Sequence, residues 1–204
     1  MSATGLEFAA LTRRFGALKV LTGASGRVEA GGVLVVRGAN GCGKSTLLRC
    51  LAALMRPDRG TIRAWEGGRE LDDDARRSRV GFLSPDLAFY DELSGSENLA
   101  FVARLRGVPA ERGEGLLARL GLPAGRLYHA MSSGMRQRLR WAFALLHDPG
   151  ILLLDEPFQN LDAEGEATAR ALLAERLAGG ALAIVASPST IDLPAVTDEL
   201  RLGG

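Results

Sequence analysis

The sequence has few cysteines, few aromatic residues and no excess of charge of either sign. Of its 204 residues two are Cys and 5% are aromatic, and 25 Lys and Arg balance 24 Asp and Glu. Cys42 and Cys50 are too few for a disulfide framework and have no Cys or His neighbour at zinc-site spacing, so we expect them to fill packed space. The balanced charge gives no reason to expect long-range attraction to nucleic acid or to an anionic bilayer.

Long apolar runs and targeting signals are also missing. No apolar run approaches the roughly 18 residues of a membrane-spanning helix. No positively charged start leads into an apolar stretch, so no secretory signal is expected. The hydrophobic fraction of 47% excludes a disordered chain. We therefore expect one globular domain, 1–204, that resides in the cytoplasm.

Hydrophobic patterning predicts an α/β fold. Alternating residues at 6–11 and around Val28 predict short antiparallel strands near the N-terminus. Continuous apolar runs at 33–36, 151–154 and 182–186 are typical of strands buried on both faces of a parallel sheet. After the run at 33–36, apolar residues recur at helical spacing, which predicts a helix that Pro57 would stop. A further helix is predicted over 163–177.

A helical insert is predicted between these strands. Ser94 and Glu97 have capping-box spacing before a helix, Pro109 opens a second helix that Gly121 ends, and a third helix is expected over 133–146. The charged stretch 72–77 is interpreted as a solvated loop. The core thus comprises about 1–84 and 149–204, and the helical subdomain about 85–148.

A glycine-rich loop lies between the strand at 33–36 and the helix that follows it. The segment from Gly38 to Ser45 matches G-x-x-x-x-G-K-[ST], which predicts a loop whose backbone N–H groups bind phosphate. Lys44 is expected to reach the β and γ phosphates, and the hydroxyl of Ser45 to bind Mg²⁺. The expected nucleotide-binding residues are Gly38, Ala39, Asn40, Gly41, Cys42, Gly43, Lys44, Ser45 and Thr46.

Two carboxylates end the apolar strand at 151–154. Asp155 and Glu156 would lie at the carboxyl edge of the parallel sheet, where such sheets bind their ligands. Asp155 is expected to pair with Mg²⁺, and Glu156 to polarise an attacking water, with Lys44 as the second catalytic residue.

The segment Met131-Ser132-Ser133-Gly134-Met135-Arg136-Gln137-Arg138 precedes a helix and resembles the signature motif of ABC ATPases. With the glycine-rich loop and the Asp-Glu pair, it makes nearly the whole chain resemble an ABC transporter ATP-binding subunit. The resemblance implies a P-loop NTPase core with a RecA-like parallel sheet, an N-terminal antiparallel β part and an inserted α-helical subdomain.

The same resemblance implies roles for residues outside the phosphate loop. Ser132, Ser133 and Gly134 would bind the γ-phosphate held by another protomer, and Phe15 would stack on adenine. Residues 160–162 would end the D-loop, which touches the partner subunit. The helical subdomain would meet a transmembrane permease subunit.

Three residues depart from the family pattern. Met135 stands where the signature usually ends in Gln, Pro85 falls near the Q-loop Gln, and Pro188 occupies the place of the switch His. Loss of a positioned polar group typically costs about 10² to 10³ in rate. Asp86, Ser187 or Ser189 are candidates to compensate.

Three functions are compatible with these residues. The first is an ATPase that uses ATP and Mg²⁺, pairs as a homodimer or heterodimer, and drives substrate movement from the inner face of the cell membrane. The second is a regulatory or degenerate subunit that hydrolyses slowly because the Gln and His are missing. The third is an ABC protein that acts on DNA or ribosomes. Such proteins usually carry two cassettes or a long insert, and neither fits in 204 residues, so no nucleic-acid partner is expected. In size the chain resembles the small ATPase of the haem exporter for cytochrome c maturation, but its substrate and transport direction stay open.

Overall fold

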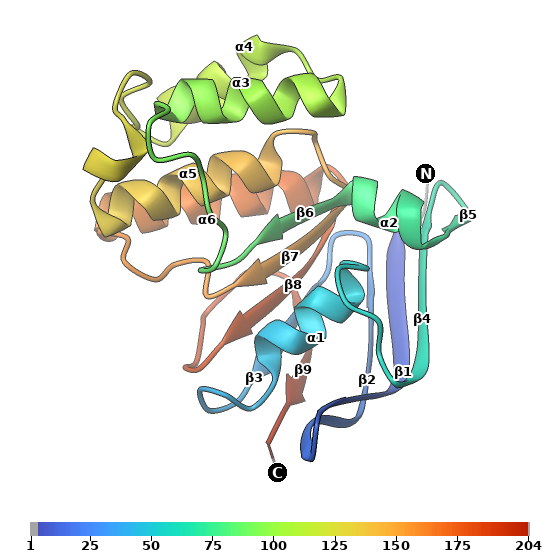
Figure 1. The fold of residues 1–204 in the computed structure, drawn as a ribbon. Helices are drawn as coiled ribbons and strands as arrows, with labels where there is room; N and C mark the ends of the chain where they lie inside the picture. Colours follow the sequence, from blue (N-terminus) through green and yellow to red (C-terminus); the bar gives the residue numbers. More distant parts are fainter. Residues whose placement is uncertain (1–3, 204) are drawn as a thin grey trace.

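The computed structural model describes residues 4–203, which form two sheets and six α-helices (Figure 1). The strands are β1 (Gly5–Phe15), β2 (Leu18–Glu29), β3 (Val33–Arg37), β4 (Arg59–Glu66), β5 (Arg69–Leu71), β6 (Val80–Leu83), β7 (Ile151–Asp155), β8 (Leu182–Ser187) and β9 (Val196–Arg201). The α-helices are α1 (Lys44–Leu51), α2 (Asp73–Arg79), α3 (Gly95–Arg106), α4 (Ala110–Arg119), α5 (Ser133–Leu145) and α6 (Ala163–Ala178), and η1 (Tyr128–Ala130) is a 3-10 turn. Within the described range, no helix is both long and apolar enough to cross a bilayer.

The predicted parallel sheet is confirmed. Its strand order is β6-β7-β8-β3-β9, and every neighbouring pair is parallel. Successive side chains of a strand point to opposite faces, so Val33 and Val35 join one hydrophobic cluster while Leu34 and Val36 join the other. Burial on both faces explains why β3, β7 and β8 are continuous apolar runs.

The antiparallel sheet lies across α1 from the parallel sheet (Figure 1). Its order is β2-β1-β4-β5, and Leu6, Phe8 and Leu11 of β1 pack in the same cluster as α1. The strands β1 and β2 have 11 and 12 residues, longer than the short strands expected. Irregular register near residues 8–13 lets β1 bend while keeping its apolar side chains inward.

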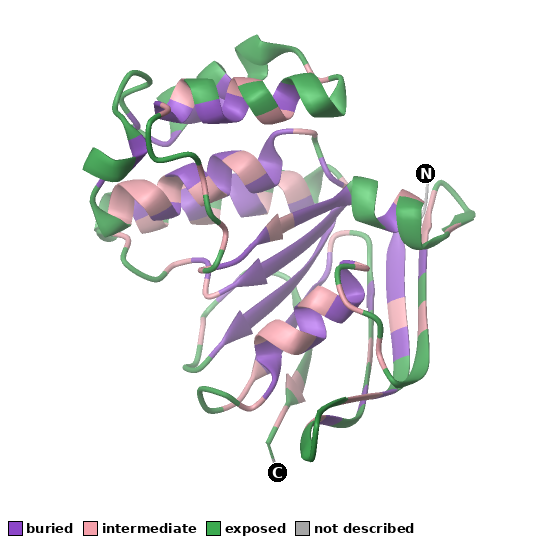
Figure 2. Cartoon of the chain, in the orientation of Figure 1, coloured by how far each residue is buried: buried purple, intermediate pink, exposed green. Residues whose placement is uncertain are grey.

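Helices cover the other face of the parallel sheet. α5 and α6 lie against this face, and α3 and α4 pack outside α5 (Figure 1). Figure 2 shows the central strands buried and the outer sides of α3 and α4 exposed. The capping box is confirmed at the start of α3, where Ser94 and Glu97 each bond to the other's backbone N–H.

The charged stretch 72–77 is not a loop, so this expectation was wrong. It forms α2, which Asp72 caps by accepting a hydrogen bond from the N–H of Ala75 (2.8 Å). Asp73 and Asp74 in the first turn pair with Arg76 and Arg77 one turn later. A short helix held by its cap and ion pairs shows no apolar periodicity, which explains the error.

Two further boundaries differ from expectation. α1 ends at Leu51, before Pro57, and Ala53 just beyond it adopts φ 57°, a conformation that cannot continue a right-handed helix. β9 pairs with β3 at the edge of the sheet and was not predicted. Its side chains are mostly exposed, so it lacks the apolar run of the central strands.

Candidate functional site

The glycine-rich loop connects β3 to α1, as predicted. Gly43 caps α1 with φ 106°, and a Cβ at this position would lie 2.6 Å from the carbonyl oxygen of Val20. A Cβ on Gly38 would lie 2.4 Å from the sulfur of Cys42. Only glycine fits at both places, and the Cys42 side chain fills the space beside Gly38.

Lys44 folds back over this loop. Its side chain is buried, and its Nζ donates to the carbonyl oxygens of Gly38 (2.8 Å) and Ala39 (3.0 Å). The ammonium therefore lies beside the N-terminus of α1, where the helix dipole adds partial positive charge. Both features favour an anion at this position.

A cavity of about 310 Å³ brings the loop together with Glu156. Its lining residues are Val20, Asn40, Gly41, Gly43, Lys44, Ser45, Thr46 and Glu156. Every residue in this set except Val20 was predicted. Val20 comes from β2 of the antiparallel sheet, and no motif marks it in the sequence. The cavity thus joins a phosphate-type loop to a carboxylate from the end of β7.

Asp155 lies beside Ser45 at the buried edge of this site. Only 2% of Asp155 is exposed. Burial raises the pKa of its carboxyl group, and the neighbouring Glu156 charge adds to this, while the Ser45 hydroxyl and the Lys44 charge oppose it. A carboxylate kept from water in this way is stabilised by a cation.

The backbone at Glu156 is held in an unusual conformation. Its φ is 48°, which is uncommon for a residue with a side chain. Its N–H donates to the carbonyl of Ala186 (3.0 Å), and its carbonyl accepts from Gln137 Nε2 (3.1 Å). The next carbonyl, that of Pro157, accepts from Gln137 Nε2 and Trp141 Nε1, both at 2.8 Å. Neither Gln137 nor Trp141 was predicted as a site residue from the sequence.

Ser132, Ser133 and Gly134 lie at the start of α5 and do not line the cavity with Lys44. Ser132 caps the helix by accepting from the N–H of Met135 (3.2 Å). A Cβ on Gly134 would lie 2.8 Å from the carbonyl of Asn160, so the two segments are in close contact.

Asp162 ends the segment 160–162 and caps α6. Its carboxylate accepts from the N–H of Gly165 (3.0 Å) and pairs with Arg138 Nη2 of α5 (2.5 Å). These contacts lower the pKa of Asp162, with the Arg138 hydrogen bond as the largest cause. The middle of α5 is thereby tied to the start of α6.

Phe15 lies at the end of β1, with 44% of its surface exposed. The Arg13 guanidinium lies over its ring, 5.1 Å from the centroid. Phe15 does not line the cavity that contains Lys44. Its expected contact with adenine stays a prediction.

The polar groups near the two prolines already have partners. Asp86, next to Pro85, pairs with Arg49 (2.5 Å). The Ser187 hydroxyl donates to the carbonyl of Ser189 (2.9 Å) and accepts from its N–H (3.2 Å). Pro188 and Glu156 line a second cavity of about 330 Å³.

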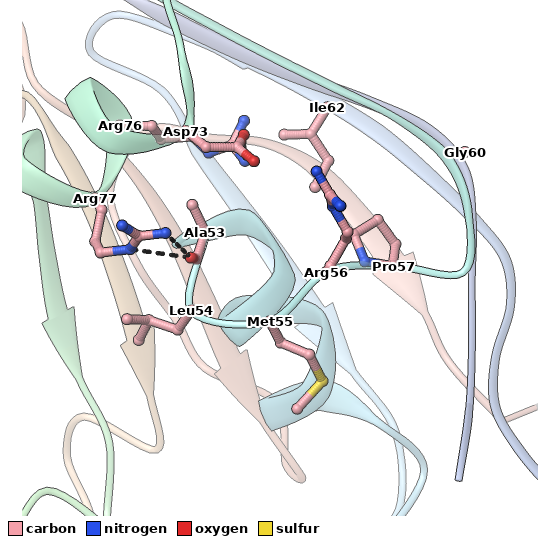
Figure 3. Close-up of a pocket in the computed structure, with 10 residues that line it drawn as sticks. All are labelled: Ala53, Leu54, Met55, Arg56, Pro57, Gly60, Ile62, Asp73, Arg76 and Arg77. Carbon is pink, nitrogen blue, oxygen red and sulfur yellow. Dashed lines mark hydrogen bonds and ion pairs between the residues drawn. The ribbon is translucent and has the colours of Figure 1, made fainter. Parts of the chain in front are cut away.

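A larger cavity of about 550 Å³ lies past the C-terminal end of α1, between 53–62 and α2 (Figure 3). Arg77 Nη2 donates there to the carbonyl of Ala53 (3.0 Å), and Asp73 pairs with the buried Arg76. This cavity contains none of the predicted site residues. The smaller cavity at the glycine-rich loop is therefore the candidate site, because the predicted chemical groups converge there.

The chain is similar to known proteins that bind ATP. Residues 21–159 match the family model described as "ABC transporter". The chain is 37% identical over 169 residues to a sulfate/thiosulfate import ATP-binding protein of Bordetella bronchiseptica, a match covering 78% of this chain and 48% of that protein. It is 38% identical to a lipoprotein-releasing system ATP-binding protein of Maricaulis maris, over 92% of this chain and 89% of that protein.

A solved structure described as an ATP binding subunit of an ABC transporter shares 28% identity and a TM-score of 0.79, covering 90% of this chain and 79% of that one. This match confirms the predicted fold class. The chain spans about half the length of the first curated relatives that it matches, 48% for the Bordetella protein.

Proposed function

Because this chain belongs to the ABC transporter family, we propose that it is an ATP-binding and ATP-hydrolysing subunit of an ABC transporter. The observation that carries this proposal is the single cavity that joins Lys44 and Ser45 to Glu156. The names of the two curated relatives, both ATP-binding proteins of transport systems, support it.

The glycine-rich loop would bind the phosphates of ATP. The backbone N–H groups of 38–46 and the N-terminus of α1 provide partial positive charge, and Lys44 provides a full one. Lys44 Nζ would exchange its bonds to the Gly38 and Ala39 carbonyls for phosphate oxygens. Phe15 is proposed to contact the adenine ring from its exposed position at the end of β1.

Ser45 and Asp155 would hold Mg²⁺. Their side chains are adjacent, oxygen ligands suit this cation, and a buried carboxylate with a raised pKa gains from a positive charge beside it. When bound, Mg²⁺ would neutralise charge on the phosphate oxygens. In this proposal Asp155 binds the cation, and Glu156 next to it acts on the water.

Glu156 would act on the attacking water. Glu156 lines the cavity together with Lys44, which supports a role for its carboxylate near the terminal phosphate. The carboxylate would orient the water and accept its proton as the water oxygen bonds to the γ-phosphorus and the bond to the β-phosphate oxygen breaks, which releases ADP and phosphate. Pro85 and Pro188 supply no polar side chain, so we expect a low intrinsic rate.

The remaining site residues would act on a second protomer. Ser132, Ser133 and Gly134 are separate from the cavity of their own chain, as expected if they bind the γ-phosphate in a homodimer or heterodimer. The helical subdomain, about 85–148, would contact a transmembrane permease subunit, and the core, about 1–84 and 149–204, would bind ATP. With such a partner, the protein would lie at the cytoplasmic face of the membrane.

The test is phosphate release from ATP by the purified chain, measured with Mg²⁺ and then with the cation removed by EDTA. We expect release that saturates with ATP and stops without Mg²⁺. Sedimentation of the same samples would show whether ATP causes dimerisation. ATP binding without release under any of these conditions would contradict the proposed hydrolysis.

A further inference from the structure

Glu156 needs external support to keep its position. A residue with a side chain is strained at a φ of 48°, so the surrounding structure must hold it. Its own strand ends at Asp155, and only the N–H of Glu156 continues to the neighbouring β8, through Ala186. The carbonyl side of the residue is held by other groups.

Among the described residues, Gln137 of α5 is the one whose side chain bonds to both carbonyls on this side. Its Nε2 donates to two successive carbonyls, those of Glu156 (3.1 Å) and Pro157 (2.8 Å). One amide nitrogen carries two N–H groups, so it can satisfy both carbonyls at once. The turn closes locally through the N–H of Gln159, which donates to the same Glu156 carbonyl (3.2 Å).

The amide of Gln137 is fixed in orientation. Both carbonyls can only accept hydrogen bonds, so the amide nitrogen must face them. On the other side, Arg140 Nη1 donates to Gln137 Oε1 (3.2 Å), which requires the oxygen there. Only 2% of Gln137 is exposed, so water competes little for these bonds.

Gln137 is also close in the helix to Ser133, which is proposed to contact the γ-phosphate bound by the second protomer. It lies four residues after Ser133, one helical turn into α5. Because consecutive turns of a helix are hydrogen-bonded to one another, a shift at the start of α5 would also move the Gln137 amide.

We propose that Gln137 is a positioning residue for hydrolysis: its side-chain amide bonds to the Glu156 and Pro157 carbonyls, aims the Glu156 carboxylate, and links it to the start of α5. This inference rests on the proposed ATP hydrolysis. Gln137 acts through Glu156 and does not itself contact the nucleotide.

The test compares Gln137→Met with Trp141→Phe in the full chain. Gln137→Met keeps the volume and removes both donors. Trp141→Phe removes only the second donor to the Pro157 carbonyl, and it perturbs a side chain that is fully buried. We expect Gln137→Met to lower kcat about 10-fold or more with ATP affinity within about twofold of the parent, because a misaimed group costs rate and not binding.

Trp141→Phe should reduce kcat much less than Gln137→Met does, even if the two substitutions lower the melting temperature equally. Equal kcat losses in the two variants, or a parent-like kcat in Gln137→Met, would overturn the inference. If Gln137→Met does not fold, Gln137→Leu takes its place, since its apolar side chain likewise cannot donate to the two carbonyls.

Hydrogen exchange of the 156–160 backbone gives a readout independent of activity. Gln137→Met should speed exchange there and leave α1 unchanged, and unchanged protection at 156–160 would overturn the inference. An inactive parent contradicts the proposed function, whereas an active parent with an equally active Gln137→Met variant contradicts only the role of Gln137.

Discussion

Pro188 and Glu156 line the same cavity of about 330 Å³, from the loop after β8 and the end of β7. The family pattern implies a His at position 188 that contacts the γ-phosphate. The nearby hydroxyl of Ser187 bonds to the backbone of Ser189, so it does not supply an equivalent free group.

Pro188→His is expected to raise kcat for ATP by about 10-fold or more, because it adds a polar group beside the reacting phosphate. Steady-state phosphate release measures the effect. Pro85→His is the matched control, since it introduces the same side chain at the other departure. A gain that is as large in the control, or no gain at position 188, would show that the cavity does not adjoin the γ-phosphate.

Lys44→Ala should weaken ATP binding by about 10-fold or more, because it removes the charge that lies inside the phosphate loop. Titration calorimetry with ATP measures it. Lys19, the only other lysine of the chain, is exposed on β2, so Lys19→Ala should bind like the parent. Parent-like affinity in Lys44→Ala would remove the loop from the binding site.

Acid should destabilise the protein partly through His147. Burial, followed by the nearby Arg106 charge, lowers the pKa of His147 from 6.5 to about 4. Between these values the unfolded state binds the proton and the folded state does not, so stability falls as the pH drops from 6.5 to about 4.

The free energy of unfolding of His147→Asn should therefore fall by about 2 kcal/mol less than that of the parent over this pH range. This value allows for the partial exposure of His147 to solvent. Urea unfolding across the same pH range measures it. The other histidine, His129, is exposed, and His129→Asn is the matched variant at a histidine that the fold does not bury. If the stability of His147→Asn falls as steeply with pH as that of the parent, His147 is not the source of the acid sensitivity.

The α/β fold was predictable because its buried strands carry continuous apolar runs, and Gly43-Lys44-Ser45 marks the phosphate loop through glycines that backbone geometry requires. The helix α2 was missed because cap and ion pairs stabilise it without an apolar face. β9 was missed because an exposed edge strand resembles a loop in sequence.

The contacts that hold Glu156 could not be predicted. Gln137 and Glu156 are separated in the chain, and a side-chain bond to a backbone carbonyl leaves no pattern in the residue types. Val20 likewise reaches the cavity only because β2 folds over the start of α1. Such contacts depend on how the two sheets and α5 pack, which local sequence patterns do not specify.

The most direct test of the account is phosphate release by the parent beside Glu156→Gln, with ATP binding measured in the same samples. The account predicts Mg²⁺-dependent release by the parent, a loss of about 10² or more in the variant, and equal ATP affinity in both. Equal release by parent and variant would contradict the assignment of Glu156 as the residue that activates water.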